Sequence, residues 1–277
     1  MNTTPVRQPL IFRHAAHNSG APAVETRDLT VRFGTLTALE KVSFAARPGE
    51  QVAIIGPNGA GKTTLFHAIA GLLEPDEGAV SVFGHPPDRH ACIAYLTQRS
   101  HVDWHFPATV RDVVFMGRLR HIGLFRRAGP ADAERVDRCL DLVGLTPLAD
   151  RRIDELSGGQ QQRMFIARAL AQEAAVLLLD EPFNGLDAQT ARDLLQILQE
   201  SARQGVCLLV STHDLDLASD HFERVVLINR RIIADGRPDK VFRAESLAAA
   251  FGGAAHLIRA ADGTVVVNTL CCGGLSP

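Results

Sequence analysis

One segment of this 277-residue chain, residues 56–63, limits the choice of folds more than any other. Its sequence, GPNGAGKT, fits the pattern G-x-x-x-x-G-K-[ST] at every defined position, between an expected strand at 51–55 and an expected helix at 62–72. Glycines there let backbone N–H groups surround phosphate oxygens, and the helix directs its positive end at the same anion. A glycine-rich turn without a ligand is the alternative, which the complete match and its context disfavour. The segment therefore predicts an α/β fold that binds a nucleotide.

An acidic strand end supplies the carboxylates that a phosphate loop needs for magnesium and for the attacking water. Residues 176–179 are apolar, as in a buried parallel strand, and Asp180 and Glu181 follow at once. We expect Lys62 to reach the terminal phosphates, and Thr63 and Asp180 to hold magnesium, while Glu181 faces the attacking water. Two carboxylates with separate roles suit phosphoryl transfer. An acidic N-cap of the next helix is the alternative explanation for the same two residues.

A second glycine pair lies ahead of the acidic strand, in residues 156–163 (LSGGQQQR). Ser157 and the two glycines place hydroxyl and N–H donors at the start of an expected helix, which makes another anion site. One chain does not need two cradles for the terminal phosphates of one nucleotide. We therefore expect the second cradle to serve the nucleotide of a partner chain.

These motifs, in this order, resemble those of the ATP-binding-cassette ATPases, and the resemblance covers residues 24–240. It implies ATP and Mg²⁺ as cofactors, and a homodimer that sandwiches two ATP molecules. The residues implied to bind ATP within one chain are Phe33, Gly56, Pro57, Asn58, Gly59, Ala60, Gly61, Lys62, Thr63 and Thr64. Those implied to contact the partner's ATP are Ser157, Gly158, Gly159 and Gln160. The implied magnesium ligands are Thr63, Gln98 and Asp180, and the implied catalytic residues are Glu181 and His213.

The resemblance also assigns roles to single residues. Phe33 matches the aromatic residue that stacks on adenine, which is usually Tyr, and Gln98 matches the glutamine that senses magnesium and the membrane partner. Asp187 matches the aspartate loop that crosses the dimer interface, although Asn184 replaces the small residue common nearby. His213 matches the switch histidine at the terminal phosphate. Alone, Phe33 would be read as ordinary core and His213 as a surface residue at a strand end.

Strands and helices alternate along most of the chain. Strands are expected at 24–33, 42–46, 51–55, 79–83, 92–96, 176–179, 206–211 and 224–228, with a hairpin at 229–236 and a strand pair at 260–270 around Asp262 and Gly263. Helices are expected at 62–72, 110–119, 130–143, 159–171, 188–204 and 215–220. This alternation around a helical insert predicts a mostly parallel sheet flanked by helices, plus an all-helical subdomain.

The fold class is therefore α/β, and the resemblance implies a P-loop NTPase with a RecA-like core sheet and an antiparallel β subdomain. The inserted helical subdomain is expected at about residues 99–160, within an ATPase domain at 24–240. Residues 1–23 are expected to form a flexible N-terminal extension, and residues 241–277 a short C-terminal one.

Charge and hydropathy restrict the partners and the compartment. Lys and Arg number 29 against 31 Asp and Glu, for a net charge of −2, which argues against nucleic acid as the main partner. No apolar run approaches the roughly eighteen residues that span a bilayer, and the N-terminus has no secretory signal. We expect a cytoplasmic protein that associates with the inner face of the cell membrane. Five scattered cysteines fit free thiols in a reducing compartment.

Residues 98–118 carry a clue to the cargo. They include QRSHVDWHFP and TVRDVVFMGR, which resemble cassettes of the manganese, zinc and iron uptake systems, at the place where that family docks its membrane subunit. Trp104 is a candidate docking contact, and the alternative is a cap on the core of the helical subdomain.

Metal binding by the chain itself is disfavoured. His101 and His105 are four residues apart, and His85, His90 and Cys92 lie nearby, but a loop with a proline does not preorganise a site. Cys271 and Cys272 form a weak candidate for a metal sensor because no histidine accompanies them.

Two classes of function remain. The first is the ATP-hydrolysing subunit of an importer for a transition-metal ion, working with a separate membrane permease and, indirectly, a substrate-binding protein. An alternative within this class is the ATP-hydrolysing subunit of a transporter for another cargo, such as an iron-siderophore or heme. The second class, a soluble cassette acting on DNA or the ribosome, usually shows paired cassettes, coiled-coil inserts or zinc modules, none of which is visible here.

Overall fold

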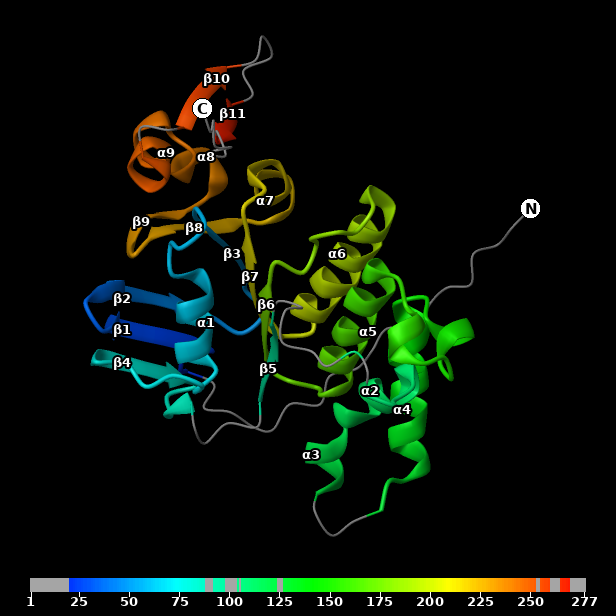
Figure 1. Ribbon diagram of the computed structural model, residues 1–277. Coiled ribbons are helices and arrows are strands. Elements are labelled where there is room, and N and C mark those ends of the chain that lie inside the picture. Colours follow the sequence, from blue (N-terminus) through cyan, green and yellow to red (C-terminus); the bar gives the residue numbers. More distant parts are fainter. Residues whose placement is uncertain are drawn as a thin grey trace.

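A six-stranded sheet forms the centre of the computed structural model, which describes residues 20–87, 92–97, 104, 106–123, 127–252, 255–259 and 265–269 (Figure 1). Its strands, in spatial order, are β5 (Ile93–Leu96), β6 (Val176–Asp180), β7 (Cys207–Thr212), β3 (Gln51–Ile55), β8 (Arg224–Asn229) and β9 (Arg231–Gly236). Neighbours pair in parallel except for β9, which runs antiparallel to β8. The expected mostly parallel sheet is confirmed.

A separate antiparallel sheet holds β2 (Leu36–Ala46), β1 (Val24–Phe33) and β4 (Glu77–Val82). β2 begins earlier than the expected strand at 42–46, because it pairs with β1 as far as Leu36 opposite Phe33. A third, two-stranded antiparallel pair joins β10 (Ala255–Arg259) and β11 (Val265–Thr269). These strands bracket the expected turn at Asp262 and Gly263, which itself lies outside the described residues.

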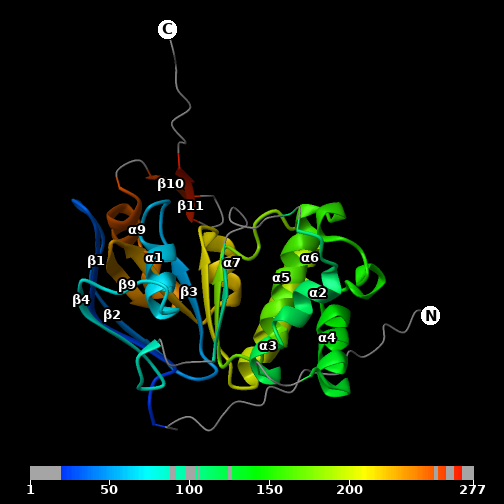
Figure 2. The same ribbon diagram turned by 60° about the horizontal axis from the view of Figure 1, so that its bottom comes forward.

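Helix α1 (Lys62–Ile69) fills the space between the two larger sheets (Figure 2). Leu65, Phe66 and Ile69 are buried there with residues of both sheets. The expected extension of this helix to Leu72 is wrong, since Gly71 has a left-handed φ of 71° and Leu72 is 65% exposed. The helix therefore ends as soon as its apolar face has been covered.

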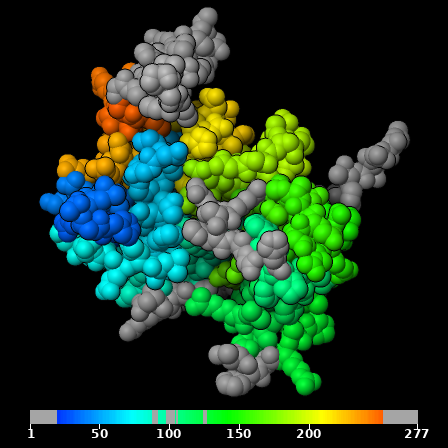
Figure 3. Space-filling view, in the orientation of Figure 1, coloured from blue at the N-terminus to red at the C-terminus, as the bar shows by residue number. Residues whose placement is uncertain are grey.

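The helical subdomain lies on the side of the central sheet away from α1 (Figures 1 and 2), and it forms the green lobe in the space-filling view (Figure 3). It comprises α2 (Val110–Met116), α3 (Leu119–Ile122), α4 (Pro130–Leu142), two 3₁₀ turns (Thr146–Leu148 and Ile153–Glu155) and the start of α5 (Gly158–Ala171). The single helix expected at 110–119 is wrong: α2 ends at Met116, and Arg118 binds Asp132 and Glu173 at the break.

Four more helices cover the core: α6 (Ala188–Arg203), α7 (Leu215–His221), α8 (Pro238–Val241) and α9 (Ala244–Phe251). The last two fall mostly in the segment expected as a C-terminal extension. Val241, Leu247 and Ala250 from α8 and α9 are buried in the main core. None of the helices in the described part of the chain is both long and apolar enough to span a bilayer.

The central sheet separates two hydrophobic cores because side chains alternate along each strand. In β3, Val52 and Ile54 face the core that contains α1, while Ala53 and Ile55 face the core that contains α5. All five residues of β6 are buried, so this strand carries Asp180 to the sheet edge from between two packed layers. The carboxyl ends of β3, β6 and β7 thus meet at one edge, where the candidate site lies.

Candidate active site

The phosphate loop follows β3, and at two of its glycines a Cβ would collide with neighbouring backbone. A Cβ on Gly56 would lie 2.1 Å from the carbonyl oxygen of Ile228, and one on Gly61 would lie 2.6 Å from that of Ala38. Gly61 also has a φ of 96°, in the region that favours glycine, and it is the N-cap of α1. The loop is therefore pressed against β8 and β2 while its amides stay available to an anion.

Lys62 is folded back over this loop. Its Nζ donates to the carbonyl oxygens of Gly56 at 2.7 Å and Pro57 at 3.1 Å, and the residue is buried. Burial lowers the pKa of Lys62 from its ordinary value, and the carboxylates of Glu181 and Asp180 oppose that shift. An ammonium that donates to neutral carbonyls at the loop is well placed to exchange them for phosphate oxygens, which carry charge.

Asp180, at the end of β6, joins the loop to the neighbouring strand. The hydroxyl of Thr63 donates to its Oδ2 at 2.6 Å, and the hydroxyl of Ser211 donates to Oδ1. Ser211 lies beside Asp180 in the parallel register of β6 and β7. Sequence reasoning missed Ser211. The pairing of two strand ends thus orients both oxygens of one buried carboxylate.

Glu181 follows in a left-handed conformation, with a φ of 51°. Its amide donates to the Ser211 hydroxyl at 3.0 Å, and its side chain is only 11% exposed. Oε1 lies 3.6 Å from Nδ1 of His213, which is itself 58% exposed, and the Asn184 amide donates to Oε2. In the sequence Asn184 stands out only as a departure from the family pattern, yet in the structure it binds this carboxylate.

These residues fit a magnesium nucleotide. Glycines that cannot accept a Cβ leave a cradle of backbone amides, and Lys62 adds a cation to it. The Thr63 hydroxyl and the Asp180 carboxylate, already in contact, are the hard oxygen donors that Mg²⁺ prefers. Thr64 is half-buried in the first turn of α1, and Phe33 is 52% exposed at the end of β1. Gln98 lies outside the described residues.

The second cradle lies away from this one. Ser157 is exposed and caps α5, where its hydroxyl accepts from the amide of Gln160 and its own amide donates to Oε1 of Gln160 at 2.9 Å. Figures 1 and 2 place α1, which opens at the phosphate loop, and α5, which opens at Ser157, on opposite sides of the central sheet. The two cradles of one chain therefore belong to helices that the central sheet separates.

Asp187 caps α6 on the exposed surface. Its Oδ1 accepts from the amides of Gln189 and Thr190, at 3.1 and 2.9 Å, and the Thr190 hydroxyl donates to Oδ2. The amide and hydroxyl of Thr190 lower the pKa of Asp187, while burial opposes this shift. The aspartate is thus held ionised and outward at the start of the helix.

A family model described as ABC transporter matches residues 39–184, which is more than half of the chain and includes both cradles and the acidic strand end. The chain belongs to the ABC transporter family. It is 42% identical over 252 residues to a manganese transport system ATP-binding protein of Halalkalibacterium halodurans, a match covering 89% of this chain and 99% of that one. A zinc transport system ATP-binding protein of Treponema pallidum is 44% identical, with 84% and 88% covered.

The fold of this ABC ATPase also matches solved cassettes. A bacterial ABC transporter cassette solved as a dimer superposes with a TM-score of 0.70 at 27% identity, covering 78% of this chain and 98% of that one. The fold class expected from the sequence is confirmed, and the chain is an ATPase of a family that couples ATP hydrolysis to transport.

The segment expected to dock the membrane subunit is described only in part. Trp104 is half-buried against the main core, and its ring meets Phe165 of α5 edge-on with centroids 5.7 Å apart. Residues 98–103 and 105, with His101 and His105, lie outside the described residues, as does His90. Docking by Trp104 stays a prediction.

The metal candidates gain no support from the described side chains. Among these side chains, no group of three histidines, cysteines or acids could hold a metal ion. Cys92, Cys139 and Cys207 carry free thiols. Cys271 and Cys272 lie outside the described residues.

Substitution of Gly56 by alanine is expected to damage this cassette directly. The new Cβ would collide with the Ile228 carbonyl, so the loop must shift, at a cost of about 1–3 kcal/mol in unfolding free energy. ATP affinity should fall because the amides move with it. Gly129→Ala is the matched control, since its Cβ meets nothing closer than 4.0 Å. Thermal denaturation with and without ATP measures both effects, and an unchanged ATP-induced rise in Tm would contradict the assignment.

Proposed function

We propose that two copies of this chain form a dimer that hydrolyses ATP at the inner face of a membrane and drives a separate permease for manganese, zinc or iron. The observation that carries the ATPase role is the convergence of Lys62, Thr63, Asp180 and Glu181 at one edge of the central sheet. Import, rather than export, and the help of a substrate-binding protein follow from the family resemblance of residues 98–118.

In this proposal each residue has a separate task. Lys62 leaves the carbonyls of Gly56 and Pro57 and binds the terminal phosphates. Thr63 and Asp180 would hold Mg²⁺, which would supply positive charge to offset that of the phosphates. Glu181 accepts a proton as a water oxygen bonds to the γ-phosphorus, and the bond from that phosphorus to ADP breaks. ADP and phosphate leave, and the proton returns to solvent.

His213 and Asn184 position the carboxylate of Glu181. His213 approaches Oε1 from the end of β7, and Asn184 donates to Oε2. Because one carboxylate oxygen is engaged by Asn184, the other is left to face His213 and the water. His213, being largely exposed, can in turn bond the γ-phosphate.

The separation of the two cradles within one chain supports the dimer in this proposal. Ser157, Gly158, Gly159 and Gln160 of one copy would close over the ATP held at Lys62 of the other, with Asp187 crossing the interface. An exposed cradle of amides and a hydroxyl at a helix N-terminus is a site for an anion such as the phosphates of a partner's ATP. Adenine would stack on the exposed ring of Phe33.

The cargo is proposed from two kinds of similarity. Relatives that match almost their whole length are named manganese and zinc transport system ATP-binding proteins. The run QRSHVDWHFP also resembles the docking segment of such systems. In this proposal the segment around Trp104 meets the permease and does not bind the ion.

Uptake measurements test the cargo. Deleting the gene in the organism that carries it should make growth depend on added manganese, zinc or iron, and should lower uptake of the radioactive ion. The wild-type gene should restore both, whereas a gene encoding Glu181→Gln should restore neither. Growth that none of the three ions rescues would overturn the cargo and leave the ATPase role to be judged separately.

A further inference from the structure

Helix α5, which starts in the helical subdomain, leads back to the central sheet through a short joint, residues 172–175, between its end and the start of β6. Glu173 in this joint has a φ of 50°, a left-handed conformation that residues other than glycine seldom adopt. Ala174 and Ala175 are buried, and the Ala175 carbonyl accepts from the Cys207 amide of β7 at 2.8 Å. The joint is therefore part of the core and not a loose linker.

Two consecutive side chains, Gln172 and Glu173, bind the joint to different parts of the protein. Gln172 donates from Nε2 to the carbonyl oxygen of Ile93 in β5 at 2.8 Å, which ties it to the central sheet. The Glu173 carboxylate instead binds the helical subdomain, with Oε2 2.6 Å from a guanidinium nitrogen of Arg118 and Oε1 3.4 Å from one of Arg135. A rotation of the subdomain relative to the sheet must therefore strain one of these contacts.

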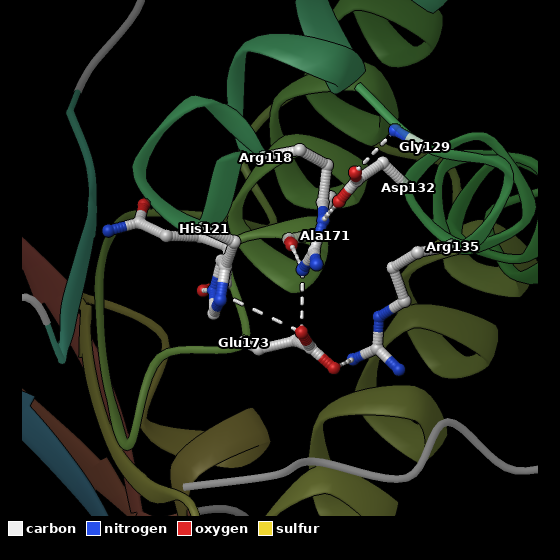
Figure 4. Close-up of polar contacts among 8 residues, drawn as sticks. Arg118, His121, Gly129, Asp132, Arg135, Ala171 and Glu173 are labelled. Carbon is white, nitrogen blue, oxygen red and sulfur yellow. Dashed lines mark hydrogen bonds and ion pairs between the residues drawn. The ribbon is translucent and has the colours of Figure 1, made fainter. Parts of the chain in front are cut away.

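Arg118, Asp132, Arg135 and Glu173 form what we call the joint cluster, shown in Figure 4 with Glu173 between the two arginines. Arg118 donates to Asp132 at 3.1 Å, to the Ala171 carbonyl at 2.9 Å, and to Glu173. The four side chains are only 9–16% exposed. One residue lies after α2, two on α4 and one in the joint, so the cluster connects all three.

The charge balance of the joint cluster depends on the carboxylate of Glu173. Two guanidinium groups face two carboxylates, and burial removes most of the water that could replace a lost partner. Burial alone would raise the pKa of Asp132, but the Gly129 amide and Arg118 together lower it, so the second carboxylate is ionised as well. Neutralising Glu173 leaves two buried cations with one anion.

Close packing fixes the same elements against each other. A Cβ on Gly117 would lie 2.4 Å from the carbonyl oxygen of Arg168 in α5, so α2 ends directly on the backbone of α5. His121 of α3 contacts the Gln172 carbonyl through Nε2 at 2.8 Å. The carboxyl end of α5, the end of α2 and α4 thus form one body, and the joint connects it to β6.

We propose that Glu173 is a positioning residue for ATP hydrolysis, which sets the angle between helix α5, capped by Ser157, and strand β6, ending in Asp180. This rests on the proposed function, in which Ser157 of one copy must meet the ATP of the other. The residue touches no nucleotide. It acts by holding Ser157 of one copy at the position where it meets the ATP bound by the other copy.

The length of α5 explains why the contacts of Glu173 at one end of the helix affect the position of Ser157 at the other. Helix α5 has 14 residues and is therefore about 21 Å long, so a tilt of about 10° at the joint moves Ser157 by about 4 Å. Reacting groups misplaced by about 1 Å can lose about 10²-fold in rate. A modest loosening at Glu173 is therefore enough to separate the cradle from the partner's phosphates.

The test uses the full-length chain carrying Glu181→Gln, so that ATP is bound but not consumed. Adding Glu173→Gln should weaken ATP-driven dimerisation about tenfold while leaving ATP binding by the monomer within about twofold. Analytical ultracentrifugation measures the dimerisation constant, and titration with a fluorescent ATP analogue at low protein concentration measures the ATP affinity of the monomer. Glu134→Gln is the matched control, because it removes a carboxylate of α4 whose partner, Arg138, is exposed.

Arg118→Lys is the second variant, in case Glu173→Gln folds poorly. It keeps the charge, but one ammonium cannot replace a planar guanidinium that serves Asp132, Ala171 and Glu173 together. It should weaken dimerisation in the same direction.

The outcomes are distinct. A purely structural role would lower Tm and leave dimerisation unchanged in the folded protein, and that result would overturn the inference. So would a fall in monomer ATP affinity as large as the fall in dimerisation. A Glu181→Gln parent that stays monomeric with ATP would contradict the proposed function itself, and this inference with it.

Discussion

Replacing Glu181 with glutamine is expected to lower ATP turnover by about 10²–10⁴-fold, because an amide cannot accept the proton of the attacking water. Glutamine keeps the shape of the side chain and can still accept from Asn184 through its amide oxygen. ATP should therefore bind normally at Lys62, and dimers should accumulate because the step that separates them is blocked. Phosphate release measures turnover, and size-exclusion chromatography with ATP detects the dimer.

Glu200→Gln is a suitable control for this prediction. It removes an exposed carboxylate near the carboxyl end of α6 that pairs with Arg203 at 3.4 Å. Its turnover should equal that of the wild type. Unimpaired hydrolysis by Glu181→Gln would contradict the role given to Glu181, whatever the dimer does.

The second large effect is expected from Gly159→Asp. A Cβ at Gly159 meets nothing closer than 3.6 Å, so the substitution should leave the fold intact. It adds a negative charge at the N-terminus of α5, where the partner's phosphates would lie. The loss of a preorganised anion site typically costs about 10²–10³-fold in rate, and we expect turnover to fall at least that far.

ATP binding by the same chain is the internal control for Gly159→Asp. The phosphate loop leads into α1, which lies on the opposite side of the central sheet from α5, so affinity for ATP at low protein concentration should stay within about twofold. Loss of ATP binding in parallel with loss of turnover would mean that the second cradle serves the chain's own nucleotide.

The phosphate loop, the acidic strand end and the cap at Ser157 could be predicted because each depends on a few neighbouring residues. The expected parallel sheet followed from the same local patterns. Ser211 was missed because its role arises only when β7 pairs with β6 in register. No local pattern in the sequence marks that contact.

Two predicted helix boundaries were wrong for a related reason. Leu72 continues the apolar period of α1, but the neighbouring sheets leave no surface for it to cover. Arg118 falls inside an apparent helix, yet its partners Asp132 and Glu173 are 14 and 55 residues away. Tertiary contacts of this kind override local propensity.

Mixing two inactive variants tests most directly whether each active site is built from two chains. Lys62→Ala loses the phosphate loop's cation, and Gly159→Asp loses the cradle, so either protein alone should be inactive. In a mixed dimer, one site combines an intact Lys62 with an intact Gly159. Equal amounts should recover about a quarter of wild-type phosphate release, since about half of randomly paired dimers carry one intact site of two. A mixture no more active than its separate components would contradict the shared site.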